Sequence, residues 1–175
     1  MNSDNKTVKV LKDKWAGINK ETLNELFIYS EGLLFWRHLN EFKKKGAIGN
    51  VNSAGYVYIS IRKRHYDTHR LIYIMHYGCI EKGLVIDHIN NIKTDNRIEN
   101  LRVATRSQNQ ANMSITRNNK TGYKGVRFSN REGKYIASIR IDGIHKDLGR
   151  FCTAIEASDV YKEACKKQFG DFSKF

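Results

Sequence analysis

The first apolar pattern along the chain predicts a short helix. Leu23, Leu26 and Phe27 recur at helical spacing, and Asn19 stands where a side-chain cap would begin the helix. We therefore expect a helix from Asn19 to about Tyr29 with one buried face.

Two strands and a second helix are predicted in the next stretch. After a turn, the apolar segment 33–37 predicts a strand, and residues 56–61 alternate in the way typical of a half-buried strand. Residues 69–77 have helical periodicity and end at Gly78, a residue favoured just after a helix. His69 in this helix could support a functional site or have only a structural role.

A separate pattern of strands begins near residue 122. Segments 122–128, 135–141 and 144–149 predict three strands, and Asp142-Gly143 between the last two is a strong signal for a two-residue hairpin turn. We therefore expect a three-stranded antiparallel sheet in this part of the chain.

One helix should follow this sheet. Thr153 and Glu156 have capping-box spacing, which predicts a helix from there to about Gln168 with a narrow stripe of small and apolar residues. Such a helix can pack closely on one face of the sheet and leave the other face, with its basic side chains, exposed.

The charge of the chain indicates a polyanionic partner. Lys and Arg number 31 and Asp and Glu 18, for a net charge of +13. Residues 1–64 carry 12 basic and 6 acidic groups (+6), residues 65–115 carry 6 and 5 (+1), and residues 116–175 carry 13 and 7 (+6). This distribution favours two phosphate-binding flanks around a nearly neutral centre over a merely solvated basic surface. The Lys43-Lys44-Lys45 run could be either a solvated loop or a phosphate contact.

Cysteine spacing and hydropathy exclude other classes of protein. Cys79, Cys152 and Cys165 form no CxxC pair, which argues against a zinc site or a disulfide framework. No apolar run approaches membrane-spanning length, and the first ten residues lack the apolar core of a signal peptide. We expect an intracellular, cytoplasmic protein with no membrane contact, in the host cytoplasm if a phage encodes it.

The nearly neutral centre carries the residues best suited to catalysis. Residues 84–86 predict a strand that ends at Asp87 and His88, and residues 101–104 predict its antiparallel partner. Thr105 or Ser107 can cap a following helix to about Ile115, with Asn109 in its first turns.

These side chains suit phosphodiester hydrolysis. Asp87 and the amide oxygen of Asn109 are hard ligands for Mg²⁺ or Mn²⁺, and zinc is not expected. His88 can take the proton from an attacking water, and Asn100 could brace that geometry across the hairpin.

This segment resembles the HNH endonucleases of phages and introns, over roughly residues 30–115. The resemblance implies a ββα-metal motif in which His88 is the general base, Asp87 and Asn109 are metal ligands and Asn100 is a structural asparagine. Asn109 replaces the final histidine of the family's name, as in its homing branch.

The C-terminal pattern resembles the AP-two/ethylene-response-factor DNA-binding domain. The segments GYKGVR, ASIR and LGRF and the Ala-rich helix occur in that family's order. The resemblance implies a sheet that enters the major groove of double-stranded DNA. The DNA-binding residues it implies are Lys124, Arg127, Arg131, Lys134, Arg140 and His145.

The sequence as a whole predicts an α+β protein: a β-hairpin and helix region leads into a ββα-metal nuclease core, and a three-stranded sheet packed on one helix follows. The expected parts are residues 1–64, which assist DNA contact, the nuclease domain 65–115, a linker 116–121 and the DNA-binding domain 122–175.

The predicted function is metal-dependent, site-directed DNA cleavage of the homing type. An inactive DNA-binding regulator on the same fold is the alternative, and a nonspecific nuclease is a third possibility. One catalytic centre per chain predicts a monomer that nicks DNA, and double-strand cleavage would require a dimer or a second event.

Overall fold

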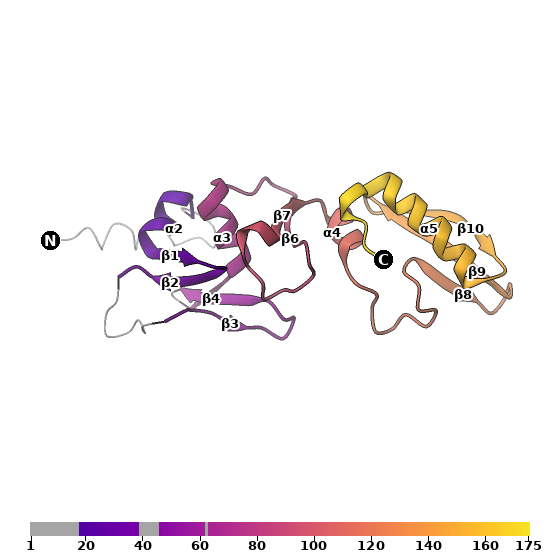
Figure 1. The fold of residues 1–175 in the computed structure, drawn as a ribbon, viewed down its shortest axis with the longest axis horizontal. Helices are drawn as coiled ribbons and strands as arrows, with labels where there is room; N and C mark the ends of the chain where they lie inside the picture. The colour runs from indigo at the N-terminus through magenta and orange to yellow at the C-terminus, as the bar shows by residue number, and fades with distance from the viewer. Residues whose placement is uncertain (1–17, 39–45, 62) are drawn as a thin grey trace. The chain divides into compact units, whose positions relative to one another are not determined.

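This computed structural model describes residues 18–38, 46–61 and 63–175 (Figure 1). The Lys43-Lys44-Lys45 run, for which a loop or a phosphate contact is predicted, lies outside the described residues, as does Arg62. No helix in the described part of the chain is long and apolar enough to cross a membrane.

The chain forms two compact units, Met1–Val103 and Ala104–Phe175. The domain boundary that the sequence predicts near residue 115 stays a prediction, and in this division into two units the helix α4 (Arg106–Asn112) falls in the second unit. The reason is local packing: Ala111 of α4 is 4% exposed and belongs to the hydrophobic core of that unit.

The first helix of the N-terminal unit is shorter than predicted. Helix α2 (Lys20–Leu26) is capped by Asn19, whose side chain accepts a hydrogen bond from the Thr22 N–H at 2.8 Å. The prediction that it continues to about Tyr29 is wrong, because the residues from Phe27 onward form strand β1 (Phe27–Ser30).

Strand β1 pairs antiparallel with β2 (Leu33–Trp36), the strand predicted over residues 33–37. Glu31 and Gly32 form the two-residue turn between them, with φ of 47° and 80°. Two consecutive positive φ values are what the favoured type I′ hairpin turn requires. The residues from Phe27 to Tyr29, which helical spacing assigns to the helix, therefore belong to this hairpin.

A second sheet and a helix complete most of this unit. The sheet has the order β3-β4-β5, with each pair antiparallel: β3 is Asn50–Val51, β4 is Val57–Ile61 and β5 is Arg64–Asp67. Ile59 and Ile61 of β4 are buried, as the alternating pattern predicts. Helix α3 (Thr68–Tyr77) ends at Gly78 as predicted.

The predicted catalytic segment joins this unit through β6 (Val85–His88) and β7 (Leu101–Ala104), which pair in a two-stranded sheet. The 3-10 helix η1 (Ile98–Asn100) leads directly into β7. Ile86 and Leu101 anchor the two strands in the hydrophobic core of the unit.

The C-terminal unit contains a three-stranded antiparallel sheet of order β10-β9-β8. Its strands are β8 (Val126–Ser129), β9 (Lys134–Ile141) and β10 (Ile144–Phe151). The predicted hairpin turn is present, with φ of 49° at Asp142 and 83° at Gly143.

Helix α5 (Ala154–Phe169) follows the sheet and lies along it in Figure 1, and the short η2 (Gly170–Phe172) comes after it. The predicted capping box of Thr153 and Glu156 is present. Ala157 and Tyr161 of α5 share a core with Ala137 and Ile139 of β9. One face of the sheet is therefore covered by α5.

Candidate active site

Asp87 and His88 are the last two residues of β6, and both are buried, at 3% and 5% exposed. Adjacent residues of a regular strand point to opposite faces, so the two side chains can share a site only where the strand ends. The chain turns directly after His88, where the Asn91 N–H donates to the His88 carbonyl oxygen at 2.9 Å. Strand β6 therefore ends at His88, which allows the side chains of Asp87 and His88 to share one site.

His88 is oriented by an asparagine that follows it in the loop. His88 Nε2 lies 3.0 Å from Asn96 Oδ1, and Asn96 is 2% exposed. An amide oxygen can only accept a hydrogen bond, so Nε2 must carry the proton and the lone pair of a neutral ring lies at Nδ1. This contact selects the nitrogen that can act as a base.

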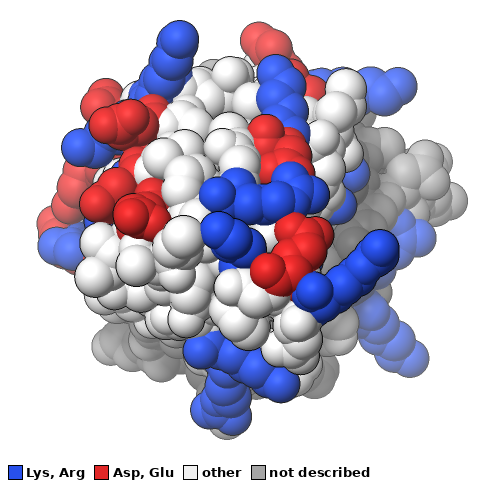
Figure 2. All heavy atoms as spheres, turned by 90° about the vertical axis from the view of Figure 1, so that its right-hand side faces the viewer, with Lys and Arg blue, Asp and Glu red and all other residues white. Residues whose placement is uncertain are grey.

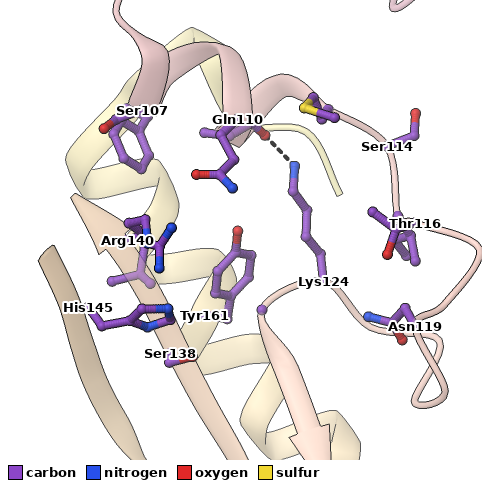
Figure 3. A pocket seen from close by; sticks show the side chains of 16 residues that line it. Ser107, Gln110, Ser114, Thr116, Asn119, Lys124, Ser138, Arg140, His145 and Tyr161 are labelled. Carbon is purple, nitrogen blue, oxygen red and sulfur yellow. Dashed lines mark hydrogen bonds between the residues drawn. The ribbon is translucent and has the colours of Figure 1, made fainter. Parts of the chain in front are cut away.

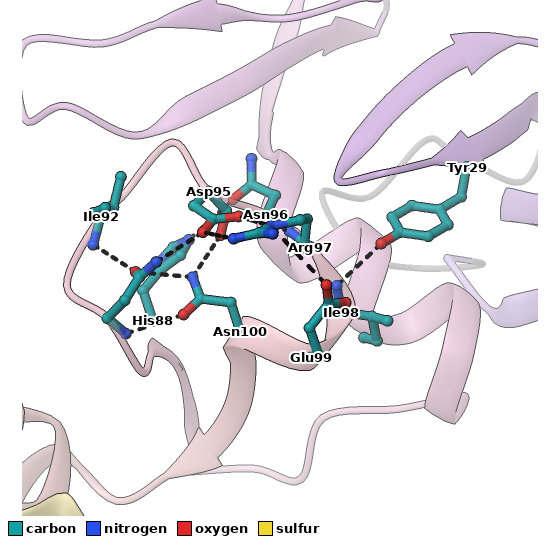
Figure 4. Close-up of polar contacts among 10 residues, drawn as sticks. Tyr29, His88, Ile92, Asp95, Asn96, Arg97, Ile98, Glu99 and Asn100 are labelled. Atoms are coloured by element: carbon teal, nitrogen blue, oxygen red, sulfur yellow. Dashed lines mark hydrogen bonds and ion pairs between the residues drawn. The ribbon is translucent and has the colours of Figure 1, made fainter.

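Asn100 cross-links the loop between β6 and η1, as Figure 4 shows. Its amide oxygen accepts from the Asn90 N–H at 3.0 Å, and its amide nitrogen donates to Asn90 Oδ1 at 3.0 Å and to the Asp95 carbonyl at 2.7 Å. Asn100 is 7% exposed. The structure thus places it as a brace for the loop that carries Asn96.

The same loop is tied by a carboxylate and by the β1–β2 hairpin. Asp95 accepts from Arg97 Nε and Nη2 at 2.8 Å each, and this pairing lowers the pKa of Asp95. The Ile98 N–H donates to the Tyr29 hydroxyl at 3.0 Å, which connects η1 to β1 (Figure 4). The loop is therefore held at several points on either side of Asn96.

Asp87 is paired with a basic residue of the neighbouring strand. Arg102 Nε of β7 lies 2.9 Å from Asp87 Oδ2, and the side chains are 19% and 4% exposed. A buried carboxylate requires such compensation. Arg102 therefore supplies this compensation from the neighbouring strand.

His69 packs against the ring of His88. The two ring centroids are 5.0 Å apart in an edge-to-face arrangement, and the ring of Tyr56 lies 5.3 Å from His69 and 6.0 Å from His88. Burial above all, and then the nearby His88 and Arg70, lower the pKa of His69 to about 3. His69 Nδ1 has no hydrogen-bond partner among the described residues. His69 is therefore a neutral, buried neighbour of the predicted base.

Asn109 lies on α4 in the C-terminal unit, with its backbone in the helical hydrogen bonds of Thr105 and Met113. Thr105, one of the two predicted caps, is the observed one, and Gln108 completes a capping box with it. The helix ends at Asn112, before the predicted limit near Ile115. The meeting of Asn109 with Asp87 at one metal stays a prediction.

The donor set of Asp87 and Asn109 fits a magnesium ion by its chemistry. Among the described residues no cluster of three or more His, Cys, Asp or Glu side chains is placed to hold a metal. Mg²⁺ does not need such a cluster, because it is commonly held by one or two protein oxygens together with water and phosphate. A carboxylate and an amide oxygen are donors of that kind.

The predicted DNA-binding residues are distributed over the sheet of the C-terminal unit. Arg127 lies opposite Ile136 in the β8–β9 register, and His145 lies opposite Arg140 in the β9–β10 register. These positions alternate with Ala137 and Ile139, which face α5, so they share the face that α5 does not cover. Arg127, Arg140 and His145 are exposed there.

Other predicted DNA contacts have protein partners. The Lys124 ammonium donates to the carbonyl oxygens of Ala111 and, at 3.0 Å, of Lys174, and burial lowers its pKa. Lys134 Nζ lies 3.2 Å from Cys152 Sγ, whereas Arg131 is exposed beside the β8–β9 turn. Lys124 thus has a structural role that its resemblance to a DNA-contacting position does not suggest.

The C-terminal unit does not present a uniformly basic surface. Figure 2 shows Asp and Glu side chains among the Lys and Arg side chains on the face turned to the viewer. Arg150 pairs with Glu132 at 2.7 Å and with Asp147 at 2.9 Å. These carboxylates neutralise part of the positive charge locally.

Sequence reasoning missed three residues of this site: Asn96, Arg102 and Tyr56. Asn96 stands in a loop that contains several asparagines, and the sequence alone does not distinguish it from the others. Arg102 is on the strand paired with β6, and a carboxylate on one strand favours a cation on its neighbour. Tyr56 carries no comparable local signal.

Comparison with known proteins places this site in a known family of domains. Residues 66–111 match the family model described as HNH endonuclease. An uncharacterized HNH endonuclease of Acanthamoeba polyphaga mimivirus is 35% identical over 106 residues, which cover 60% of this chain and 54% of that protein. Protein 3.8 of Escherichia phage T7 is 32% identical over 66 residues, which cover 38% of this chain and 54% of that protein. No solved structure matches the chain.

The chain therefore contains an HNH endonuclease domain and is homologous to a viral HNH endonuclease. The matched segments span about half the length of the curated relatives. The predicted HNH domain is confirmed, and the matched range includes Asp87, His88, Asn100 and Asn109. The homing type and the AP-two/ethylene-response-factor resemblance stay predictions.

Proposed function

We propose that this chain is a metal-dependent, site-directed DNA endonuclease of the homing type. The observation that carries the proposal is the contact of His88 Nε2 with Asn96 Oδ1 at the end of β6. It leaves Nδ1 as the basic nitrogen of a buried histidine next to a buried carboxylate, which is an arrangement suited to general-base catalysis.

In this proposal His88 Nδ1 takes the proton from the water that attacks the phosphorus atom. Asp87 and Asn109 would hold Mg²⁺ or Mn²⁺, which would supply charge stabilisation at the phosphate and at the leaving oxygen. Asn96 keeps the His88 ring in the correct tautomer, and Asn100 holds the loop that carries Asn96.

In this proposal His69 supports the base, His88, through the contact between their rings. Its ring closes one side of His88 without adding positive charge, since burial keeps it neutral. A neutral neighbour does not repel the proton that His88 accepts in this mechanism.

The exposed face of the β8–β9–β10 sheet is the proposed surface for double-stranded DNA. Arg127, Arg140 and His145 on that face, with Arg131 at the turn, are able to donate hydrogen bonds to phosphates and base edges. The resemblance to the AP-two/ethylene-response-factor domain implies that Lys124 and Lys134 also contact DNA.

Cleavage of DNA from the genomic region that flanks the coding sequence tests the proposal. Purified protein with Mg²⁺ should cut this DNA, and His88→Ala should reduce the rate by a factor on the order of 100 or more, because proton transfer to a positioned base contributes that much. His65→Gln is the matched control, since His65 is an exposed histidine of β5 whose Nδ1 lies 2.9 Å from Ser60 Oγ. Equal activity of wild type and His88→Ala would contradict the proposal.

The ion pair of Asp87 with Arg102 is the observation that favours the alternative, an inactive DNA-binding regulator. A carboxylate already held by a guanidinium is less available to a metal ion. Binding of the flanking DNA without cleavage in Mg²⁺ or Mn²⁺ is the outcome expected of a regulator. End-labelling each strand separately would also distinguish a nick from a double-strand cut.

A further inference from the structure

The C-terminal unit contains a cavity of about 390 Å³ that the proposed cleavage mechanism does not use. Figure 3 shows it enclosed by α4 above, the segment after α4 on one side and the end of β9 on the other. Its volume lies within the range of pockets that bind small molecules. All of its lining residues belong to the C-terminal unit.

The charged side chains that line the cavity are all basic. Lys124, Arg140 and His145 contribute to the lining, and none of the lining residues is Asp or Glu. Figure 3 shows the Lys124 side chain crossing the cavity toward the carbonyl of Ala111. An anionic group inside would meet favourable charge without a carboxylate to repel it.

One side of the cavity is the edge of β9 beyond the residues that pair with β8. The Ser138 N–H donates to the Gly125 carbonyl at 2.9 Å, and the Asp142 N–H donates to Ser107 Oγ at 2.9 Å. Alternate residues of a strand direct their N–H and C=O groups to the same side. The main-chain N–H and C=O of Arg140, midway between these two residues, therefore point to this edge as well.

Helix α5 lines another side of the cavity with the aromatic rings of Tyr161 and Phe169, and the remaining lining includes apolar side chains. Ala111, Ile139, Tyr161 and Phe169 contribute to the lining, and each is buried. Figure 3 shows the Tyr161 ring beside the Lys124 side chain. The cavity thus combines an apolar floor on α5, a donor and acceptor pair on a strand edge, and basic side chains.

From this combination we infer that the cavity binds one nucleotide of a DNA strand, with its base unstacked. The base lies against the apolar floor with its edge at the Arg140 main chain, and the phosphate lies at the basic side chains of Arg140 and His145. A base must leave the stack to enter such a pocket, as in enzymes that act on single bases. The inference rests on the proposed function, because it assumes a DNA substrate.

Nuclear magnetic resonance of the full-length chain tests this site directly. The chain carries His88→Ala, so that cleavage cannot consume the probe, and the probes are pentathymidylate, thymidine 5′-monophosphate, thymidine and inorganic phosphate. Pentathymidylate should shift the amide signals of Gly125, Ser138 and Arg140. It should bind about tenfold more tightly than the monophosphate, since its further phosphates reach the basic side chains.

The other probes separate the possible ligands. The monophosphate should bind more tightly than thymidine or phosphate alone. Equal binding of phosphate and the monophosphate would mean an anion site only, and tighter binding of the monophosphate than of pentathymidylate would mean a free nucleotide as ligand. Either result would overturn the inference, as would an amide shift at Arg127, which lies on the open sheet face and does not line the cavity, without shifts at Gly125 and Ser138.

Two substitutions act on the cavity in different ways. Arg140→Ala, which removes charge, and Ser138→Tyr, which fills space without changing charge, should each weaken pentathymidylate binding about tenfold. Lys146→Ala is the matched control, because Lys146 is an exposed cation of β10 that does not line the cavity. Unchanged amide signals outside the cavity establish that the variants fold, and equal weakening by Lys146→Ala would overturn the inference.

This experiment can fail independently of the proposed function. A wild-type chain that binds pentathymidylate at these amides but cuts no DNA would overturn the endonuclease proposal alone. A chain that cuts DNA while the amides of Gly125, Ser138 and Arg140 stay unshifted would overturn the nucleotide site alone.

Discussion

At the scale of single residues, the hydrogen bond of Asn96 decides how His88 can act. A histidine with no fixed hydrogen-bond acceptor would populate two tautomers, and the proposed mechanism needs the one whose lone pair is at Nδ1. Asn96 is buried, and Asp95 before it and Asn100 after it are held by hydrogen bonds. The tautomer is therefore fixed by the loop rather than by the strand that carries His88.

Asn96→Ala should reduce cleavage by a factor on the order of 10 to 100, as loss of a group that orients an active-site histidine commonly does. The reduction should be in kcat, with DNA affinity changed little, because Asn96 is buried. Asn118→Ala, at an exposed position outside this loop, is the control. Rates measured under single-turnover conditions would check the prediction, and a pure loss of DNA affinity would contradict it.

His69 predicts how stability depends on pH. Its folded-state pKa of about 3 lies below the ordinary histidine pKa of 6.5, so the unfolded chain binds a proton that the folded chain excludes. Stability should therefore fall as the pH drops below about 6.5, by up to about 2 kcal/mol between pH 7 and pH 5. Urea unfolding at both pH values checks this. His69→Gln, which cannot titrate, should show a smaller difference, and an equal one would refute the assignment.

At the scale of elements, the β1–β2 hairpin supports the catalytic loop. A side chain added at Gly32 in its turn would place Cβ 2.7 Å from the Arg97 nitrogen and 2.9 Å from the Asn96 carbonyl carbon. The Tyr29 hydroxyl of the same hairpin accepts from the Ile98 N–H. The hairpin and the loop around Asn96 are therefore packed backbone against backbone.

Gly32→Ala should destabilise the N-terminal unit and also slow cleavage, because the loop must move to admit the methyl group. Gly83→Ala is a matched control: its φ is 92° against 80° at Gly32, and nothing lies within 4 Å of the added Cβ. Positive φ alone should cost about 1–2 kcal/mol in both variants. The clash should add at least about 1 kcal/mol at Gly32. Equal unfolding free energies and equal rates would contradict this.

The elements also show what local sequence can predict. Strand β4, the Asp142-Gly143 turn and the Thr153 capping box were predictable, because alternation, turn chemistry and capping act over a few residues. The β1 strand was not, since Phe27 fits a helical pattern and only pairing with β2 decides its structure. The contact of His88 with Asn96 likewise depends on how the whole loop folds.

At the scale of the whole molecule, the boundary between the two units passes through the matched HNH segment. The family match covers residues 66–111, and the second unit begins at Ala104. Helix α4 is bound to that unit by the Lys124 ammonium and by the Lys174 N–H, which both donate to the Ala111 carbonyl. A chain shortened at residue 115 would therefore lose the partners of the helix that carries Asn109.

The same contacts predict that two basic residues of the C-terminal unit differ in their effect on DNA binding. Arg127 is exposed on the open sheet face, so Arg127→Ala should reduce the slope of log affinity against log salt by about 1 and leave unfolding unchanged. The Lys124 ammonium is held by two carbonyl oxygens. Lys124→Ala should therefore change the slope less and lower the melting temperature.

Binding of the flanking DNA at several salt concentrations, together with thermal unfolding of both variants, checks this pair. With a net charge of +13, wild-type binding should itself weaken steeply as salt rises. A slope that falls equally in both variants, with no loss of stability in Lys124→Ala, would mean that Lys124 leaves its carbonyl partners to contact phosphate. Lys124 would then be a DNA-binding residue of the kind that the resemblance implies, and α4 would have to be held by its core contacts through Ala111 instead.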